Sequence, residues 1–142
     1  SKLARRSGVL LHPTSFPGPW GIGDLGAAAR RFVDFLGATH QQLWQLLPLG
    51  PTAEDGSPYS SFSSSAGNPL LISIEDLVSE GVAAPVDAPG HPAAAPVDQA
   101  AVRAAKLPAL RAIARRFLAG SPLRVDYDAF CASRADWLDD YA

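Results

Sequence analysis

The residues best suited to bind a polar ligand gather in one segment, 48–69, which is rich in Ser, Pro and Gly. Its centre reads Ser57-Pro58-Tyr59 and its end reads Ala66-Gly67-Asn68-Pro69. An aromatic ring rimmed by hydroxyl and amide groups combines an apolar face with hydrogen-bonding partners, which complements a sugar ring. A flexible serine-rich loop accounts for the same composition equally well. Composition alone leaves both interpretations open.

A glycine pattern raises the possibility of a dinucleotide site. Gly21-Ile22-Gly23-Asp24-Leu25-Gly26 fits G-x-G-x-x-G, but three prolines separate it from the nearest upstream apolar run. Leu47-Pro48-Leu49 stands where an acidic residue should end the second strand and bind the ribose. We interpret the pattern as a turn that enters a helix capped by Asp24.

The sequence gives little support for a metal site or for an acid–base pair of carboxylates. His12, His40 and His91 are scattered, with no carboxylate or thiol at ligand spacing. Glu54 and Asp55 are adjacent acids without the apolar neighbours that would separate their pKa values, so we interpret them as solvated. No G-x-S-x-G string occurs. We therefore expect neither a metal nor an organic cofactor.

Composition narrows the class of partner. The 142 residues include 12 Lys+Arg and 14 Asp+Glu, for a net charge of −2, which gives no basic surplus for nucleic acid or an anionic membrane. The apolar runs are far shorter than the ~20 residues of a membrane span, and no signal peptide opens the sequence. The single cysteine suits a reducing compartment. We expect a cytoplasmic protein with a small or neutral partner, and neither nucleic acid nor membrane.

The elements that must position the loop begin with a strand–helix–strand unit. Residues 8–11 form a short apolar run that predicts a buried strand, and 43–47 predict a second one. Between them, residues 25–36 predict an amphipathic helix that Gly37 closes. Such a unit favours a parallel sheet, with loops 12–24 and 48–69 following its two strands.

The second half predicts helices. Ser73 caps a short helix that Gly81 ends, and residues 83–96 read as a linker. A further helix over 102–117 is either kinked at Pro108 or restarted there. Its basic residues are interpreted as a solvated face: Arg103, Lys106, Arg111, Arg115 and Arg116. Residues 127–141 predict one helix, and no C-cap residue follows it. We therefore expect this chain to be a piece of a longer protein.

Several strings resemble the opening of the 4-α-glucanotransferases, the amylomaltase or disproportionating-enzyme family. The similarity runs in order from about Arg5 to Gly81, and 137–142 also resembles a helix of that family, whereas 82–124 is similar only in character. The strings that carry it are Arg5-Arg6-Ser7-Gly8-Val9-Leu10-Leu11-His12-Pro13-Thr14-Ser15, Gly21-Ile22-Gly23-Asp24-Leu25-Gly26, Trp44-Gln45-Leu46-Leu47-Pro48-Leu49-Gly50-Pro51-Thr52, Ser57-Pro58-Tyr59 and Ala66-Gly67-Asn68-Pro69.

The resemblance implies an α/β fold: the N-terminal part of a (β/α)₈ TIM barrel with an inserted helical subdomain. Such a barrel needs ~250 residues, so the barrel is incomplete in this chain. Residues 1–81 would supply its first strands and helices with active-site loops. Residues 82–142 would form a linker and a helical insert, with the chain ending inside a helix.

The resemblance also implies a 4-α-glucanotransferase that moves α-1,4-glucan segments between maltooligosaccharides, with glucose as acceptor. The mechanism would be a retaining double displacement by two carboxylates from later strands. No catalytic residue then lies in this chain, which is expected to be inactive alone and to need no cofactor. By the resemblance, Tyr59 packs against the glucose ring beside the nucleophile, Ser57 hydrogen-bonds a sugar hydroxyl, and Asn68 braces the loop.

Two alternatives remain open: an α-glucan hydrolase of the same fold, and a non-catalytic glucan-binding fragment. The sequence also departs from the family's pattern at one place. Where relatives tend to read Gly-Tyr-Gly-Asp, this chain has Ala53-Glu54-Asp55-Gly56. The absent tyrosine removes the support for a secondary glucan contact and for large cyclic products.

Overall fold

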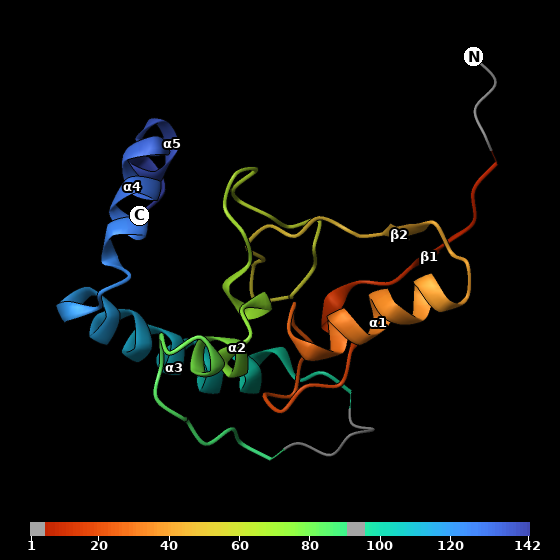
Figure 1. Cartoon of the computed structure of the whole chain (residues 1–142), viewed down its shortest axis with the longest axis horizontal. Helices are drawn as coiled ribbons and strands as arrows, with labels where there is room; N and C mark the ends of the chain where they lie inside the picture. The colour runs from red at the N-terminus through yellow and green to blue at the C-terminus, as the bar shows by residue number, and fades with distance from the viewer. Residues whose placement is uncertain (1–4, 91–95) are drawn as a thin grey trace.

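The computed structural model describes residues 5–90 and 96–142, so His91 and part of the predicted linker lie outside the described residues. Figure 1 shows β1, β2 and α1 together, with α3 beneath the central loops and α4 and α5 beyond its C-terminal end. The elements are β1 (Gly8–Leu10), η1 (Pro13–Ser15), α1 (Ala27–Ala38), β2 (Leu43–Gln45), η2 (Pro69–Leu71), α2 (Ile74–Ser79), α3 (Gln99–Gly120), α4 (Arg124–Ser133) and α5 (Ala135–Tyr141).

The predicted strand–helix–strand unit is confirmed. β1 and β2 pair in parallel with Val9 opposite Trp44, although each strand is shorter than the apolar run that predicted it and is exposed or half-buried rather than buried. The Trp44 ring packs on α1, with its centroid 5.2 Å from that of Phe32, and on Phe16 at 5.9 Å. Its indole N–H donates to the carbonyl of Leu11 at 2.7 Å. Helix and strands therefore form a small α/β layer.

Both predicted ends of α1 are wrong, for reasons visible in its hydrogen bonds. The N-cap is Gly26, whose carbonyl accepts the first helical bond from the Arg30 N–H at 3.1 Å, while the Asp24 carboxylate accepts from the Gly26 N–H at 3.0 Å in the turn before the helix. The helix passes through Gly37, and His40 adopts the left-handed conformation, with φ 58°. The Gln41 N–H then donates to the carbonyl of Leu36 at 2.9 Å, which closes the helix in a Schellman motif.

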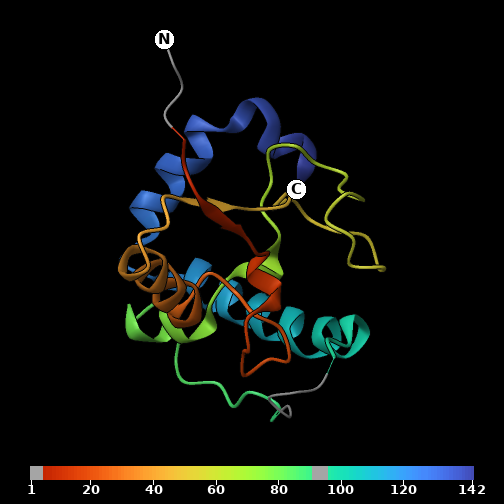
Figure 2. The same cartoon turned by 90° about the vertical axis from the view of Figure 1, so that its right-hand side faces the viewer.

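The core lies between the first loop, η2, α2 and α3. Two buried clusters make it, and Figure 2 shows the first loop crossing α3, with α2 next to that helix. Their residues are Trp20, Ile74 and Ile113 in one, and Ile22, Leu70 and Val102 in the other. The prediction for α2 is confirmed, since the Ser73 hydroxyl accepts from the Asp76 N–H at 3.1 Å and Gly81 takes φ 73° at its end.

α3 corrects the interpretation of the basic residues. The helix runs through Pro108 without a break, so a second helix does not start there. Lys106 is 0% exposed on the buried side of α3, and Arg103 is half-buried, so neither belongs to a solvated face. The three basic residues that do face solvent are Arg111, Arg115 and Arg116.

The C-terminal residues also differ from the prediction of one helix. Arg134, with φ −125°, separates α4 from α5. The ring of Tyr141 in α5 stacks on Phe62 of the second loop, with centroids 6.3 Å apart. Within residues 5–90 and 96–142, no helix has the length and apolar character that crossing a bilayer requires.

Candidate functional site

Two loops lie at the carboxyl ends of the parallel strands: the first loop, 11–26, after β1, and the second loop, 46–68, after β2. Because β1 and β2 are parallel, both loops begin at the same edge of the sheet, which is the edge where ligands bind in α/β folds. The second loop is closed at its base, where the Asn68 N–H donates to the carbonyl of Leu49 at 2.8 Å.

A cavity of about 700 Å³ opens along the second loop. Tyr59 and Phe62 stand at it with 74% and 70% of their surfaces exposed, and because Phe62 also stacks on Tyr141, Tyr59 offers the more open ring face to a ligand. Ser61, Ser63 and Ser64 also line the cavity. The lining residues are Pro48, Leu49, Gly50, Pro58, Tyr59, Ser61, Phe62, Ser63 and Ser64.

Ser57 lies in the turn that presents Tyr59. Its hydroxyl oxygen accepts from the Tyr59 N–H at 3.3 Å, and its own N–H donates to the Asp55 carboxylate at 3.1 Å. The same carboxylate accepts from the Ser60 hydroxyl at 3.3 Å. Asp55 is exposed, as predicted, and it fastens the turn. The hydroxyl proton of Ser57 is left to donate to a ligand.

Asn68 lies apart from these two residues, at the base of the loop. Its side chain is buried, and its Oδ1 caps η2 by accepting from the Leu70 N–H at 3.0 Å. Neither Asn68 nor Ser57 is among the residues that line the cavity, but Ser57 is bonded to the backbone of Tyr59, which is. The structure therefore brings Ser57 and Tyr59 together and places Asn68 where it shapes the loop.

The arms of the second loop pair with each other. Thr52 and Ser61 form an antiparallel bridge, and the Ala53 N–H donates to the carbonyl of Ser60 at 3.3 Å. Gly56, with φ 70°, makes the turn between them. The tip that carries Tyr59 is therefore a short hairpin rather than an unpaired serine-rich strand.

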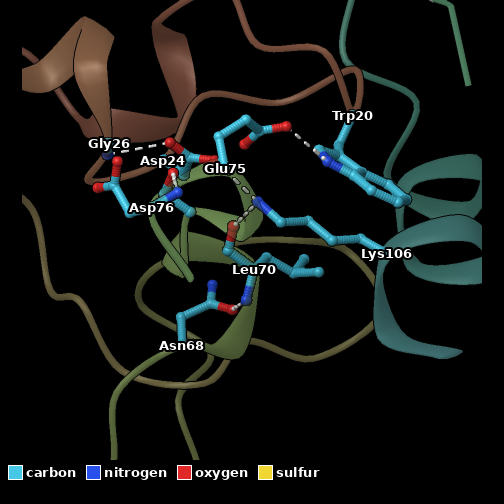
Figure 3. A network of polar contacts seen from close by, with 9 residues as sticks. Trp20, Asp24, Gly26, Asn68, Leu70, Glu75, Asp76 and Lys106 are labelled. Carbon is cyan, nitrogen blue, oxygen red and sulfur yellow. Dashed lines mark hydrogen bonds and ion pairs between the residues drawn. The ribbon is translucent and has the colours of Figure 1, made fainter. Parts of the chain in front are cut away.

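Sequence reasoning missed the basic residues that support this loop. The Lys106 ammonium donates to the Asp24 carboxylate at 3.0 Å and to the carbonyl of Leu70 at 2.9 Å, as Figure 3 shows. A signal was present, because Lys106 follows Val102 by four residues and precedes Ile113 by seven, on one helical stripe. A lysine inside an apolar stripe predicts a buried partner.

Two titratable groups near the loops have shifted pKa values. Burial lowers the pKa of His12, whose Nδ1 lies 2.7 Å from the Thr14 hydroxyl. The hydrogen bonds from Arg30 lower the pKa of Asp76, against a smaller opposing effect of burial. In the part of the chain that the structure describes, no three His, Cys, Asp or Glu side chains are grouped so as to hold a metal ion.

Comparisons with known proteins agree with one another. A family profile described as 4-alpha-glucanotransferase matches residues 11–142. The 4-alpha-glucanotransferase of Thermus thermophilus is 46% identical over 99% of this chain and 28% of its own length. The chloroplastic/amyloplastic 4-alpha-glucanotransferase of Solanum tuberosum is 41% identical over 97% of this chain and 25% of its own length.

A solved structure has the same fold over nearly the whole chain. The amylomaltase from Streptococcus agalactiae in complex with acarbose superposes with a TM-score of 0.85 and 38% identity. The match covers 98% of this chain and 28% of that one, so the chain spans little more than a quarter of its relatives' length. On the profile and the identities together, the chain belongs to the 4-α-glucanotransferase family.

Proposed function

We propose that the protein carrying this chain transfers α-1,4-glucan segments between maltooligosaccharides and accepts them on glucose. The observation that carries the proposal is the exposed ring of Tyr59, with the Ser57 hydroxyl beside it, at the carboxyl edge of a parallel sheet. An apolar ring face with a hydrogen-bond donor at its rim fits the face and the hydroxyls of a glucose unit.

We propose further that β1 and β2 are the first strands of a (β/α)₈ barrel. Side chains alternate along a strand, so Leu10 and Leu43 point away from the Trp44 face that α1 covers. They are 54% and 47% exposed, which supports a layer that the strands of a barrel interior would cover. In this proposal residues 1–81 belong to the barrel and 82–142 to a linker and a helical insert.

The chemistry in this proposal is a retaining double displacement by two carboxylates about 5–5.5 Å apart. The acids nearest the loop tip do not serve as that pair, because the Asp55 carboxylate is engaged by Ser57 and Ser60 in the turn. The residues of this chain bind and orient the sugar instead. Tyr59 supports the ring beside the nucleophile, Ser57 donates to a hydroxyl, and Asn68 braces the loop.

Incubating the full-length protein with maltotriose tests the proposal. Transfer gives glucose together with oligosaccharides longer than maltotriose, and labelled glucose enters the products. Glucose and maltose without longer products would instead identify a hydrolase of the same fold. Quenching of Trp20 or Trp44 fluorescence by maltotriose without any product would identify a glucan-binding protein.

We propose a cytoplasmic location, with no cofactor, nucleic acid or membrane taking part. The near-balance of acidic and basic residues and the single cysteine support this proposal. Measuring glucan transfer by protein treated with a metal chelator tests whether a metal cofactor is needed. Loss of activity on chelation, restored by a divalent cation, would contradict it.

A further inference from the structure

We propose that α3 holds the second loop in place. Its Arg103 and Lys106 act as positioning residues that fix where Tyr59 lies. The two side chains leave α3 three residues apart, so they share one face of the helix. Arg103 contacts the second loop itself, and Lys106 contacts η2, directly after that loop, together with Asp24 of the first loop. The inference rests on the proposed function, since the loop positions a sugar only if the protein binds glucan.

Arg103 holds the outgoing arm of the loop. Its Nη2 donates to the Thr52 carbonyl at 2.8 Å, to the Thr52 hydroxyl at 2.8 Å and to the Ala53 carbonyl at 2.7 Å. Thr52 itself is only 7% exposed. None of the ion pairs found in residues 5–90 and 96–142 includes Arg103. Its charge therefore acts on the oxygens of the loop, as strong charge-assisted hydrogen bonds.

The hairpin passes this restraint on to Tyr59. Thr52 and Ala53 pair with Ser61 and Ser60, and Ser60 directly follows Tyr59 in the chain. Backbone pairing leaves the two arms little freedom to slide past each other. When Arg103 fixes Thr52 and Ala53, it also fixes the backbone that carries the aromatic ring.

The first turn of α3 supports the tip of the same hairpin. A Cβ built on Gly56 would lie 2.6 Å from Cδ of Gln99, so the turn of the loop rests directly on that side chain. Gln99 precedes Arg103 by four residues and lies on the same helix face. The contact between α3 and the loop thus extends from the tip to the arm.

Lys106 holds the returning end of the loop. Its ammonium donates to the Leu70 carbonyl, while the Leu70 N–H donates to the side chain of Asn68 at 3.0 Å. Asn68 in turn closes the loop onto Leu49. The same ammonium pairs with Asp24 of the first loop, so one buried cation ties both loops to α3 (Figure 3).

The test uses the full-length protein with Arg103→Ala, Arg103→Lys and a matched control, Arg115→Ala. Arg115 is exposed on the same helix, and the described residues offer it no hydrogen bond or ion pair. The rate of maltotriose disproportionation is measured against substrate concentration. Hydrogen exchange over residues 52–63 is measured by mass spectrometry on the same proteins, without substrate.

For Arg103→Ala we expect kcat/KM to fall about tenfold, mainly through a higher KM, because the loop loses the charge-assisted hydrogen bonds to Thr52 and Ala53. A loose loop must be ordered by the substrate, which raises KM, whereas simple loss of folded protein lowers kcat at constant KM. We also expect faster exchange over 52–63 alone, partial recovery in Arg103→Lys, and wild-type values in Arg115→Ala.

Kinetics and exchange in Arg103→Ala that match those of Arg115→Ala would overturn the positioning role of α3 while leaving the transferase proposal intact. A wild-type protein that neither transfers nor binds glucan would overturn both. If Arg103→Ala does not fold, Thr52→Val removes one of the three acceptors and keeps the arginine. An unchanged KM and unchanged exchange in that variant would then contradict the proposal.

Discussion

The two loops at the carboxyl edge of the sheet follow equivalent strands but are held in opposite ways. The first loop buries apolar side chains in the core that it shares with η2, α2 and α3, with Trp20 2% and Ile22 1% exposed. The second loop turns its aromatic residues outward, with Tyr59 74% exposed. It is fixed instead by polar contacts at its arms and base. The exposed Tyr59 ring adds no packing to the loop, so its support comes from the stacking of Phe62 on Tyr141 and from polar contacts with α3.

The largest expected effect comes from breaking the ion pair that joins the first loop to α3. Lys106→Met leaves the Asp24 carboxylate buried and unpaired, which should cost about 3–5 kcal/mol in the free energy of unfolding. Calorimetry of the full-length protein measures this as a lower Tm. Replacing both partners, as Asp24→Asn with Lys106→Met, should recover part of the loss. A Tm for Lys106→Met equal to that of Arg115→Ala would contradict the assigned role.

The next effect separates binding from stability at the tip of the second loop. Tyr59→Ala removes the ring proposed to support the sugar, and we expect kcat/KM for maltotriose to fall about 100-fold. The Tm should not change, because the side chain is mostly exposed. Tyr59→Phe keeps the ring face and should retain most of the activity. Wild-type kinetics in Tyr59→Ala would remove Tyr59 from the site.

A smaller effect is expected at the base of the loop. Asn68→Ala removes the cap of η2, which should cost about 1 kcal/mol. Asn68→Asp keeps the accepting oxygen and serves as its control. Hydrogen exchange should rise at Leu70 in the alanine variant and stay low in the aspartate variant. Equal exchange in both variants would show that the cap does not hold the loop.

The smallest effect is a pH dependence that belongs to the first loop. Burial lowers the pKa of His12 below its ordinary value of 6.5, so below pH 6.5 the unfolded chain binds more protons than the folded chain. This contribution to stability is complete above pH 6.5 and is lost as the pH falls toward the lowered pKa. The measurement is the difference in Tm between wild type and His12→Asn across this range. A difference that does not vary with pH would contradict the shift.

Sequence patterns predicted the elements whose signals are local. The apolar runs at 8–11 and 43–47 marked the two strands, and Ser73 with Gly81 marked both ends of α2. The order of the sequence strings that resemble the 4-α-glucanotransferases was enough to predict the family, and the family profile confirms it.

The missed features depend on contacts between distant segments. Asp24 is a residue type that often serves as an N-cap, but its carboxylate pairs with a lysine that lies 82 positions away in the sequence. Arg103 binds Thr52 across 51 positions, and no periodicity reports such a pair. The break at Arg134 likewise lies inside a continuous apolar pattern. The sequence correctly predicted that Glu54 and Asp55 of the second loop are exposed but could not reveal what fixes the loop.

The measurement that tests the central claim most directly is a crystal structure of the full-length protein with acarbose, the compound bound in the Streptococcus agalactiae amylomaltase. The account predicts a sugar ring within about 4 Å of the Tyr59 ring, with Ser57 at its edge and Arg103 still on Thr52. Acarbose bound elsewhere, with the second loop untouched, would contradict the assignment of this loop as the glucan site.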